Sequence, residues 1–346
     1  MSTENVYQHY VSQFYLKLFS NNDKSIGMYR FKDRKYIQNA SIKEVCQRKY
    51  FYGKDQILEK WYRDREGEWS KVINKIIETE YLPTDEVDLY DLLSLICLSD
   101  IRTAFSADSF KDFNKKHLNI CAALYKEHGR EFSEKDIKRF SQSWSIQHLQ
   151  SVLNTPKMVE TINDLSLALI INTSSRQFVT SDTPVAKYNK LFVERNYHFS
   201  YGCGQYGILI FYPLSPTLCI LLYDSNVYNV TLSKGNILKV TSVDQVQEIN
   251  KLLIKNANES VFFNNTEKQW VIERAITSRK TKHTDFGNSS FGNATSGYLE
   301  IMSVVSIFDK IKLPQFVIKE PFMKCPLPRH GALMIRPTVR ELEREY

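Results

Sequence analysis

The sequence is short of glycine and proline, with 12 and 10 among its 346 residues. Their joint share is about half of the usual share, which is near 12%, and this excludes collagen-like and linker-like chains. A disordered chain is excluded as well. With 42% apolar residues, the chain can bury enough surface to offset the loss of conformational entropy on folding. The length predicts roughly two domains, or one large α+β domain with a helical half.

Cysteine pairs and long apolar runs are also missing. The six cysteines are scattered and none forms a C-x-x-C pair, so we interpret them as small buried residues, not as zinc ligands or disulfides. The longest apolar runs, Leu165 to Ile171 and Tyr206 to Leu214, are shorter than the roughly 20 residues of a membrane span. The first five residues lack the basic-then-apolar order of a signal peptide. We therefore expect a soluble, cytoplasmic protein without a membrane partner.

Several motifs that identify a reaction are absent. The chain contains no G-x-x-x-x-G-K-[ST] phosphate loop, no G-x-G-x-x-G, no G-x-S-x-G and no H-E-x-x-H. The formal net charge of +7 comes from dispersed lysines and arginines. A dedicated nucleic-acid-binding protein usually concentrates such residues on one face, so the charge permits a nucleic-acid partner but does not require one.

The hydrophobic pattern divides the chain into four regions. Residues 1–55 hold an aromatic segment and a β-hairpin, residues 56–163 are helical, and residues 164–277 form a mainly antiparallel sheet with one amphipathic helix. Residues 278–346 are expected to be a flexible loop and a C-terminal segment. The predicted fold class is thus α+β, with an N-terminal β-hairpin and a helical bundle packed on this sheet.

Within these regions the periodicity predicts individual elements. Proline 83 separates the first two expected helices. The expected helices are 57–77, 86–105 and 243–256, and the expected strands are 27–31, 34–37, 165–172, 176–180, 206–211, 217–223 and 260–263.

A histidine surrounded by aromatic residues is the first candidate for chemistry. His9 lies in the segment Gln8–Phe19, which contains four aromatic side chains. An imidazole with an ordinary pKa of about 6.5 can act as an acid, a base or a metal ligand near neutral pH. The alternative is a packing segment in which His9 is hydrogen-bonded to the backbone.

The second candidate lies where an apolar strand is expected to stop. Pro184 cannot continue a sheet ladder, which leaves Ser181 and Asp182 at a strand end, a common place for functional residues. The alternative is an Asx-turn, in which the Asp182 carboxylate accepts backbone N–H bonds.

Charged residues on the expected helices form a third group. Glu59 and Glu66 lie on one flank of the helix 57–77, roughly 10 Å apart, which is too far for both to hold one ion easily. Arg65 projects into the apolar stripe of this helix, and Asp100 lies on the apolar side of the next. A buried charge needs a partner, so we expect Asp100 to pair with Arg65 or to lie near His9.

The order of these motifs resembles a bacterial family catalogued as domain of unknown function 4238. The family pattern His-Tyr-Val-Pro-x-Phe-Tyr-Leu-x-x-Phe is followed by a glutamate-bearing helix, Thr-Ser-Asp-Asn-Pro-Val, Pro-Leu-Ser-Pro, and an asparagine-bearing helix before an aromatic strand. The matching residues are His9, Tyr10, Val11, Phe14, Tyr15, Leu16, Phe19, Glu59, Thr180, Ser181, Asp182, Pro184, Val185, Pro213 to Pro216, and Asn250 through Phe263. The sequence departs from the pattern at Ser12, Thr183 and Ala104. The resemblance implies that His9, Glu59, Ser181 and Asp182 belong to one recurring set, without implying a reaction.

We therefore predict a metal-assisted phosphodiesterase or nuclease that acts on RNA or DNA, as an effector in bacterial antiviral defence. Glu59 and Asp182 would hold a divalent cation such as magnesium, and His9 would activate water or protonate the leaving group, beside Ser181. The predicted binding residues are Arg65, Asp100 and Arg102. Two alternatives remain open: a non-catalytic binding or scaffold protein, with a protein partner or as a homo-oligomer, in which His9 and Asp182 are structural; and hydrolysis or transfer on a small nucleotide.

Overall fold

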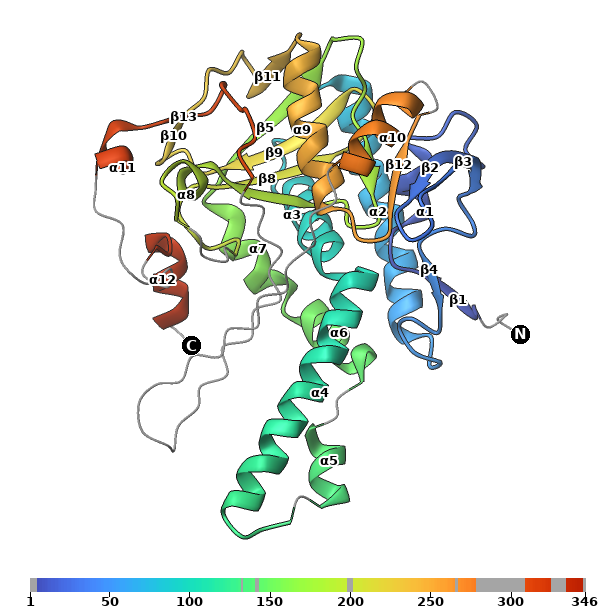
Figure 1. Ribbon diagram of the computed structural model, residues 1–346. Coiled ribbons are helices and arrows are strands. Elements are labelled where there is room, and N and C mark those ends of the chain that lie inside the picture. The colour runs from blue at the N-terminus through green and yellow to red at the C-terminus, as the bar shows by residue number, and fades with distance from the viewer. Residues whose placement is uncertain are drawn as a thin grey trace.

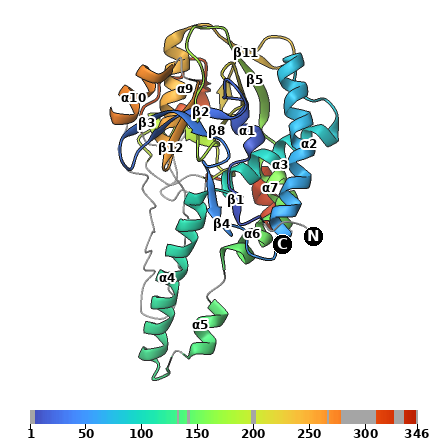
Figure 2. The same ribbon diagram turned by 90° about the vertical axis from the view of Figure 1, so that its right-hand side faces the viewer.

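The computed structural model describes residues 5–131, 133–140, 143–197, 202–264, 267–277, 309–324 and 334–344. Within them the chain forms a mixed α+β fold, as predicted. None of the described helices combines the length and the apolar character needed to cross a bilayer. Figures 1 and 2 show helices α4 and α5 projecting away from the body that holds the sheets.

The larger sheet has five strands in the order β11-β5-β9-β8-β7. Its pairs are antiparallel except for β11 and β5, which are parallel. Strands β8 and β9 are buried at every position, which explains their unbroken apolar sequence. The sheet consists of β5 (Ser166–Asn172), β7 (Ala186–Asn189), β8 (Ile208–Pro213), β9 (Leu218–Tyr223) and β11 (Ile237–Val240).

The second sheet joins strands from distant parts of the chain. Its order is β3-β2-β12-β6 and all its pairs are antiparallel. The predicted hairpin is confirmed as β2 and β3, but it is not a separate N-terminal unit, because β2 pairs with β12. The strands are β2 (Ser25–Arg30), β3 (Lys35–Ser41), β6 (Thr180–Ser181) and β12 (Ser260–Phe263).

Two further strand pairs are short. Strand β1 (Tyr7–His9) pairs with β4 (Gln47–Lys49), and β10 (Tyr228–Asn229) pairs with β13 (Val317–Ile318). The sequence pattern predicts neither pair, because both join residues far apart in the chain over two or three positions. Of the expected strand 176–180, only the last residue lies in a strand, β6. Residues 176–179 do not join a ladder.

The helices surround these sheets. Helix α9 packs beside β6 and β7, α3 packs against α2 and α7, and α10 contacts α9 and β2. The helices are α1 (Gln13–Lys17), α2 (Ile57–Thr79), α3 (Glu86–Ile101), α4 (Ala104–Glu127), α5 (Glu134–Phe140), α6 (Trp144–Leu153), α7 (Thr155–Asn163), α8 (Lys190–Glu194), α9 (Val243–Asn256), α10 (Lys268–Thr277), α11 (Glu320–Lys324) and α12 (Pro337–Arg344).

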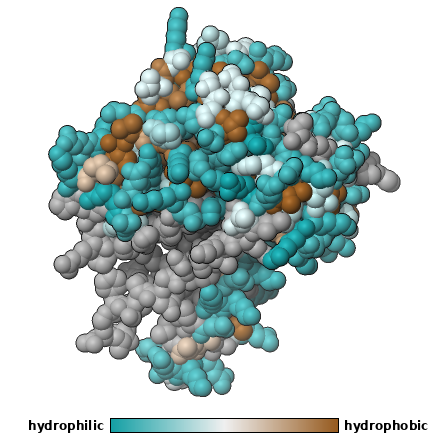
Figure 3. Space-filling view, turned by 45° about the horizontal axis from the view of Figure 1, so that its top comes forward, coloured by the Kyte–Doolittle hydropathy of each residue, from teal (hydrophilic) through white to brown (hydrophobic). Residues whose placement is uncertain are grey.

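The C-terminal region is only partly described. The expected mobile loop at 279–297 lies outside the described residues. The described parts of the region 278–346 are built into the body: Ile311, Leu313 and Phe316 are buried, and α12 packs against α7. On the face drawn in Figure 3, the described surface is hydrophilic over most of its area, with apolar side chains in separate patches.

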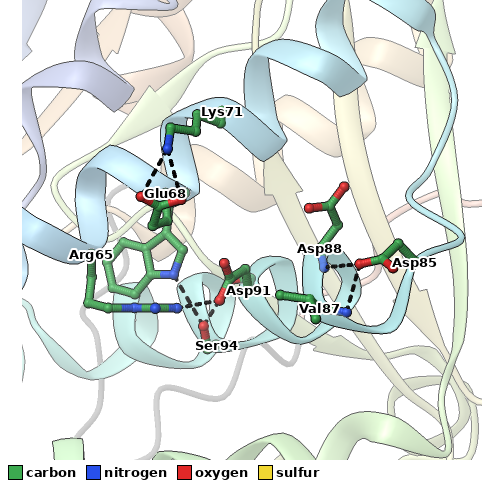
Figure 4. A network of polar contacts seen from close by, with 9 residues as sticks. Arg65, Glu68, Lys71, Asp85, Val87, Asp88, Asp91 and Ser94 are labelled. Atoms are coloured by element: carbon green, nitrogen blue, oxygen red, sulfur yellow. Dashed lines mark hydrogen bonds and ion pairs between the residues drawn. The ribbon is translucent and has the colours of Figure 1, made fainter.

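Helix α3 is buried on nearly all sides, and its start is fixed by a side-chain cap. The Asp85 carboxylate accepts hydrogen bonds from the backbone N–H groups of Val87 (3.0 Å) and Asp88 (3.2 Å), as Figure 4 shows. Replacing Asp85 with Ala should lower the free energy of unfolding by about 1 kcal/mol, measured by urea denaturation. Asp85→Asn keeps an acceptor and should restore most of this loss. An Asp85→Ala variant as stable as the parent would contradict the assignment of the cap.

Candidate functional site

A cavity of about 200 Å³ lies between the N-terminal segment, α2 and the end of α3. We call it the His9 pocket. Helix α2 contributes side chains spaced by three or four residues, which lie on one helix face. The lining residues are Asn5, His9, Gln13, Glu59, Tyr62, Arg63, Glu66 and Arg102. The structure thus brings together His9, Glu59 and Arg102 among the predicted site residues.

The position of His9 is fixed by strand pairing and by its ring nitrogens. His9 lies opposite Gln47 in the β1–β4 pair. Its Nε2 is 3.2 Å from the carbonyl oxygen of Lys43, and its Nδ1 is 3.4 Å from Gln13 Nε2. A carbonyl can only accept, so Nε2 carries the proton and Nδ1 accepts from the amide. Burial lowers the pKa of His9, so the imidazole is neutral near neutral pH.

The two glutamates of α2 have different surroundings. Glu59 Oε1 accepts a hydrogen bond from Asn5 Nδ2 at 2.5 Å, and burial raises the pKa of this carboxyl. Glu66 Oε1 accepts from Ser12 Oγ at 2.5 Å and lies 3.0 Å from Arg102 Nη1. The pocket therefore holds one carboxyl whose pKa is raised by burial and one that is paired with a cation.

Arg102 connects the pocket to the core. Its guanidinium is only 3% exposed and lies over the ring of Tyr62, 3.9 Å from the ring centre. It donates from Nε to Tyr52 Oη and from Nη2 to the carbonyl oxygen of His9, both at 3.0 Å. Nη1 lies 3.0 Å from Glu66 Oε1 and forms an ion pair with this carboxylate. Arg102 therefore joins the backbone of His9 and the carboxylate of Glu66 to the core.

Asp182 and Ser181 do not line the His9 pocket, although they were predicted to act there. The Asp182 carboxylate is buried and accepts from the backbone N–H groups of Asn258 (2.9 Å) and Glu259 (2.7 Å). Ser181 Oγ donates to the carbonyl oxygen of Thr183 at 2.9 Å. Asp182 thus accepts hydrogen bonds from backbone N–H groups, as expected if it is structural. The donors lie in the turn between α9 and β12, and not in a local Asx-turn.

The predicted magnesium site needs Glu59 and Asp182 on one ion, and the structure does not bring Asp182 to the pocket that holds Glu59. Among the residues that the structure describes, no three His, Cys, Asp or Glu side chains are grouped so that they could hold a metal ion. The donor set at the pocket does not fit a resident divalent cation, and we derive no step through one.

The predicted partners of Arg65 and Asp100 are wrong. Arg65 pairs with Asp91 across the α2–α3 contact, as Figure 4 shows, and its guanidinium lies 5.8 Å from the ring centre of Trp69. Asp100 instead accepts from Lys187 Nζ at 2.6 Å. The helix periodicity identified the buried side of each helix. It does not determine how far one helix is shifted along the other, and this shift places Asp91 beside Arg65.

Asn5, Gln13 and Arg63 also line the pocket, although they were not predicted. Arg63 was detectable, since it lies one turn from both Glu59 and Glu66 on α2. Asn5 and Gln13 carry no comparable signal, because their contacts to Glu59 and His9 are tertiary or follow from the local fold.

Comparison with known proteins gives one match. A family model described as "Protein of unknown function (DUF4238)" matches residues 7–267. No curated protein and no solved structure matches the chain. The matched range contains every residue of the His9 pocket except Asn5.

Proposed function

Because the chain belongs to the family of proteins of unknown function described as DUF4238, a description that names no reaction, we propose its function from the chemistry of the His9 pocket: a phosphodiesterase that cleaves RNA or DNA. One observation carries the proposal. A neutral imidazole, a carboxyl with a raised pKa and a buried guanidinium line one small cavity.

These groups can divide an acid–base reaction between them. His9 Nδ1 takes a proton from water as the water oxygen attacks phosphorus, once the long contact to Gln13 is released. The bond from phosphorus to the leaving sugar oxygen breaks, and protonated Glu59 donates its proton to that oxygen. Arg102 and Arg63 supply positive charge for the phosphate oxygens. A role as an effector in antiviral defence belongs to the same proposal.

Replacing Glu59 with Gln should reduce cleavage of a labelled RNA or DNA oligonucleotide by about 100-fold or more, because general acid catalysis contributes roughly 10²- to 10⁴-fold. Glutamine keeps an oxygen for Asn5, so the fold should persist. The matched control is Glu68→Gln, which changes an exposed glutamate of the same helix and should leave cleavage unchanged. The assay includes magnesium and EDTA arms, and loss of cleavage in EDTA would show that a divalent cation is also needed.

The pH dependence gives an independent check. Cleavage requires His9 without its extra proton and Glu59 with its proton, so activity should fall as the pH rises through the raised pKa of Glu59.

The contribution of Glu59 to the stability of the fold should also fall as the pH rises. The folded state binds the Glu59 proton more tightly than the unfolded state does, so this contribution is lost as the pH rises above about 4.5, the ordinary value. Glu59→Gln should therefore gain melting temperature relative to the parent as the pH rises. Cleavage that increases steadily up to alkaline pH would reject these roles.

The alternative, a non-catalytic binding or scaffold protein, is favoured by the contacts of His9 and Asp182. His9 contacts Lys43, just after β3, and Asp182 binds the turn just before β12, which pairs with β2. Both contacts hold the hairpin to the rest of the protein. If this is their whole role, the parent protein should cleave no oligonucleotide and His9→Gln should only lower the melting temperature.

A further inference from the structure

A second and larger cavity, of about 390 Å³, shares no lining residue with the His9 pocket. We call it the Lys187 cavity. It lies among α3, the first turns of α4, α6 and β7. Its volume is within the range of roughly 300–1,000 Å³ that is usual for small-molecule sites. Six of its lining residues are charged or aromatic: Asp100, Phe105, Phe110, Phe113, Trp144 and Lys187.

An ion pair forms the charged part of this cavity. Lys187 Nζ donates to Asp100 Oδ2 at 2.6 Å, and the two side chains are 17% and 23% exposed. Burial alone would lower the pKa of Lys187, but Asp100 raises it above its ordinary value, so the ammonium is charged. Within the described part of the chain, this is the one hydrogen bond that either side chain makes. Lys187 therefore keeps N–H donors, and Asp100 keeps one carboxylate oxygen as an acceptor, side by side.

Aromatic rings form another part of the lining. The ring centres of Phe110 and Trp144 are 6.1 Å apart, and those of Phe110 and Phe113 are 6.4 Å apart. These rings give the cavity an apolar, aromatic wall. Six serine and threonine hydroxyls also line the cavity, which suits a ligand with many polar groups and disfavours a lipid chain.

We propose that the Lys187 cavity binds the nucleobase of a nucleoside or nucleotide. Each nucleobase has a flat π face and an edge on which a hydrogen-bond donor stands next to an acceptor. The face would stack on the rings of α4 and α6, and the edge would pair with Asp100 and Lys187. Acceptance of a base amino or imino hydrogen by a carboxylate is an established way to recognise a base. This inference does not depend on the phosphodiesterase proposal, because it concerns binding at a different cavity.

Isothermal titration calorimetry of the full chain with adenosine, guanosine, cytidine and uridine tests the proposal. At least one nucleoside should bind saturably with one site per chain, and ribose 5-phosphate should not compete with it. A short single-stranded oligoribonucleotide that binds more tightly at the same site would identify RNA as the source of the base. Absence of saturable binding by all four nucleosides at millimolar concentration, or equal competition by ribose 5-phosphate, overturns the proposal.

The Asp100→Asn variant tests the proposed contact to the base edge most directly. The amide oxygen can still accept from Lys187, while the free acceptor becomes an N–H donor, so nucleoside binding should weaken at least tenfold. The matched control is Asp88→Asn, which removes the same charge from the same helix at a surface pair with Lys75 and should leave binding unchanged. Phe110→Leu should weaken binding roughly tenfold, since stacking contributes about 1–3 kcal/mol per base. Circular dichroism melting establishes that each variant is folded. Unchanged nucleoside binding by folded Asp100→Asn would reject the proposed contact between the base edge and Asp100.

Discussion

An Asp182→Ala variant should lose about 3–6 kcal/mol of unfolding free energy, because hydrogen bonds to a charged group contribute about 1.5–3 kcal/mol each and the variant removes at least two. Its oxygens accept from the backbone N–H groups of Asn258 and Glu259, and the side chain is 2% exposed. Without the carboxylate, both backbone donors lose this partner. Urea denaturation followed by circular dichroism measures the loss.

Two further variants make this experiment decisive. Asp112→Ala changes an exposed aspartate of α4 and should leave the unfolding free energy unchanged. Asp182→Asn keeps one acceptor but turns an amide N–H₂ toward the second donor, so its stability should lie between those of Asp182→Ala and the parent. If Asp182→Ala is as stable as the parent and has lost an activity that the parent possesses, Asp182 is catalytic and the structural interpretation is wrong.

The second large effect is expected at Arg336, where Ala should cost about 3–5 kcal/mol, as is typical when one member of a buried ion pair is removed. The Arg336 side chain is fully buried. Its Nε and Nη2 donate to the two oxygens of Asp164, at 2.8 and 2.9 Å. Its remaining hydrogen bonds reach the carbonyl oxygens of Thr161, Cys203 and Gln205. One side chain thus joins the segment before α12 to α7 and to the loop before β8.

Hydrogen exchange distinguishes two ways in which this energy could be lost. If α12 detaches alone, the N–H groups of α12 after Pro337 exchange faster, while those of β8 and β9 remain protected. If the contact supports the whole body, all amides lose protection together. Arg130→Ala, at an exposed arginine after α4, is the control and should change neither pattern. A parent-like unfolding free energy for Arg336→Ala would contradict the role assigned to this side chain.

Elements with a local signal were predictable from the sequence. The apolar runs of β8 and β9 and the short connection between them predicted an antiparallel pair, and the helical spacing gave α9 within its observed bounds. The parallel β11–β5 pair and the place of β12 beside β2 were not predictable. Such pairings depend on residues distant in sequence, and many arrangements satisfy the same apolar pattern.

The sequence predicted one part of the candidate site and misplaced another. His9 and Glu59, which both belong to the predicted site, line one pocket, and Arg102 joins them. Asp182 was misplaced because its partners are backbone N–H groups, which every residue except proline carries and which no side-chain pattern reveals. Lys187, the partner of Asp100, was missed because it lies on a strand 87 residues later in the chain.

The position of β12 between β2 and β6 has a consequence for producing this protein in parts. During synthesis the ribosome releases the hairpin more than two hundred residues before Ser260–Phe263, the strand that covers its edge. A fragment that stops before residue 260 would expose the backbone N–H and C=O groups of Ser25–Arg30, a template for association with other chains. Expression trials should therefore keep Ser260–Phe263 in the polypeptide, and excised N-terminal pieces should accumulate as aggregates.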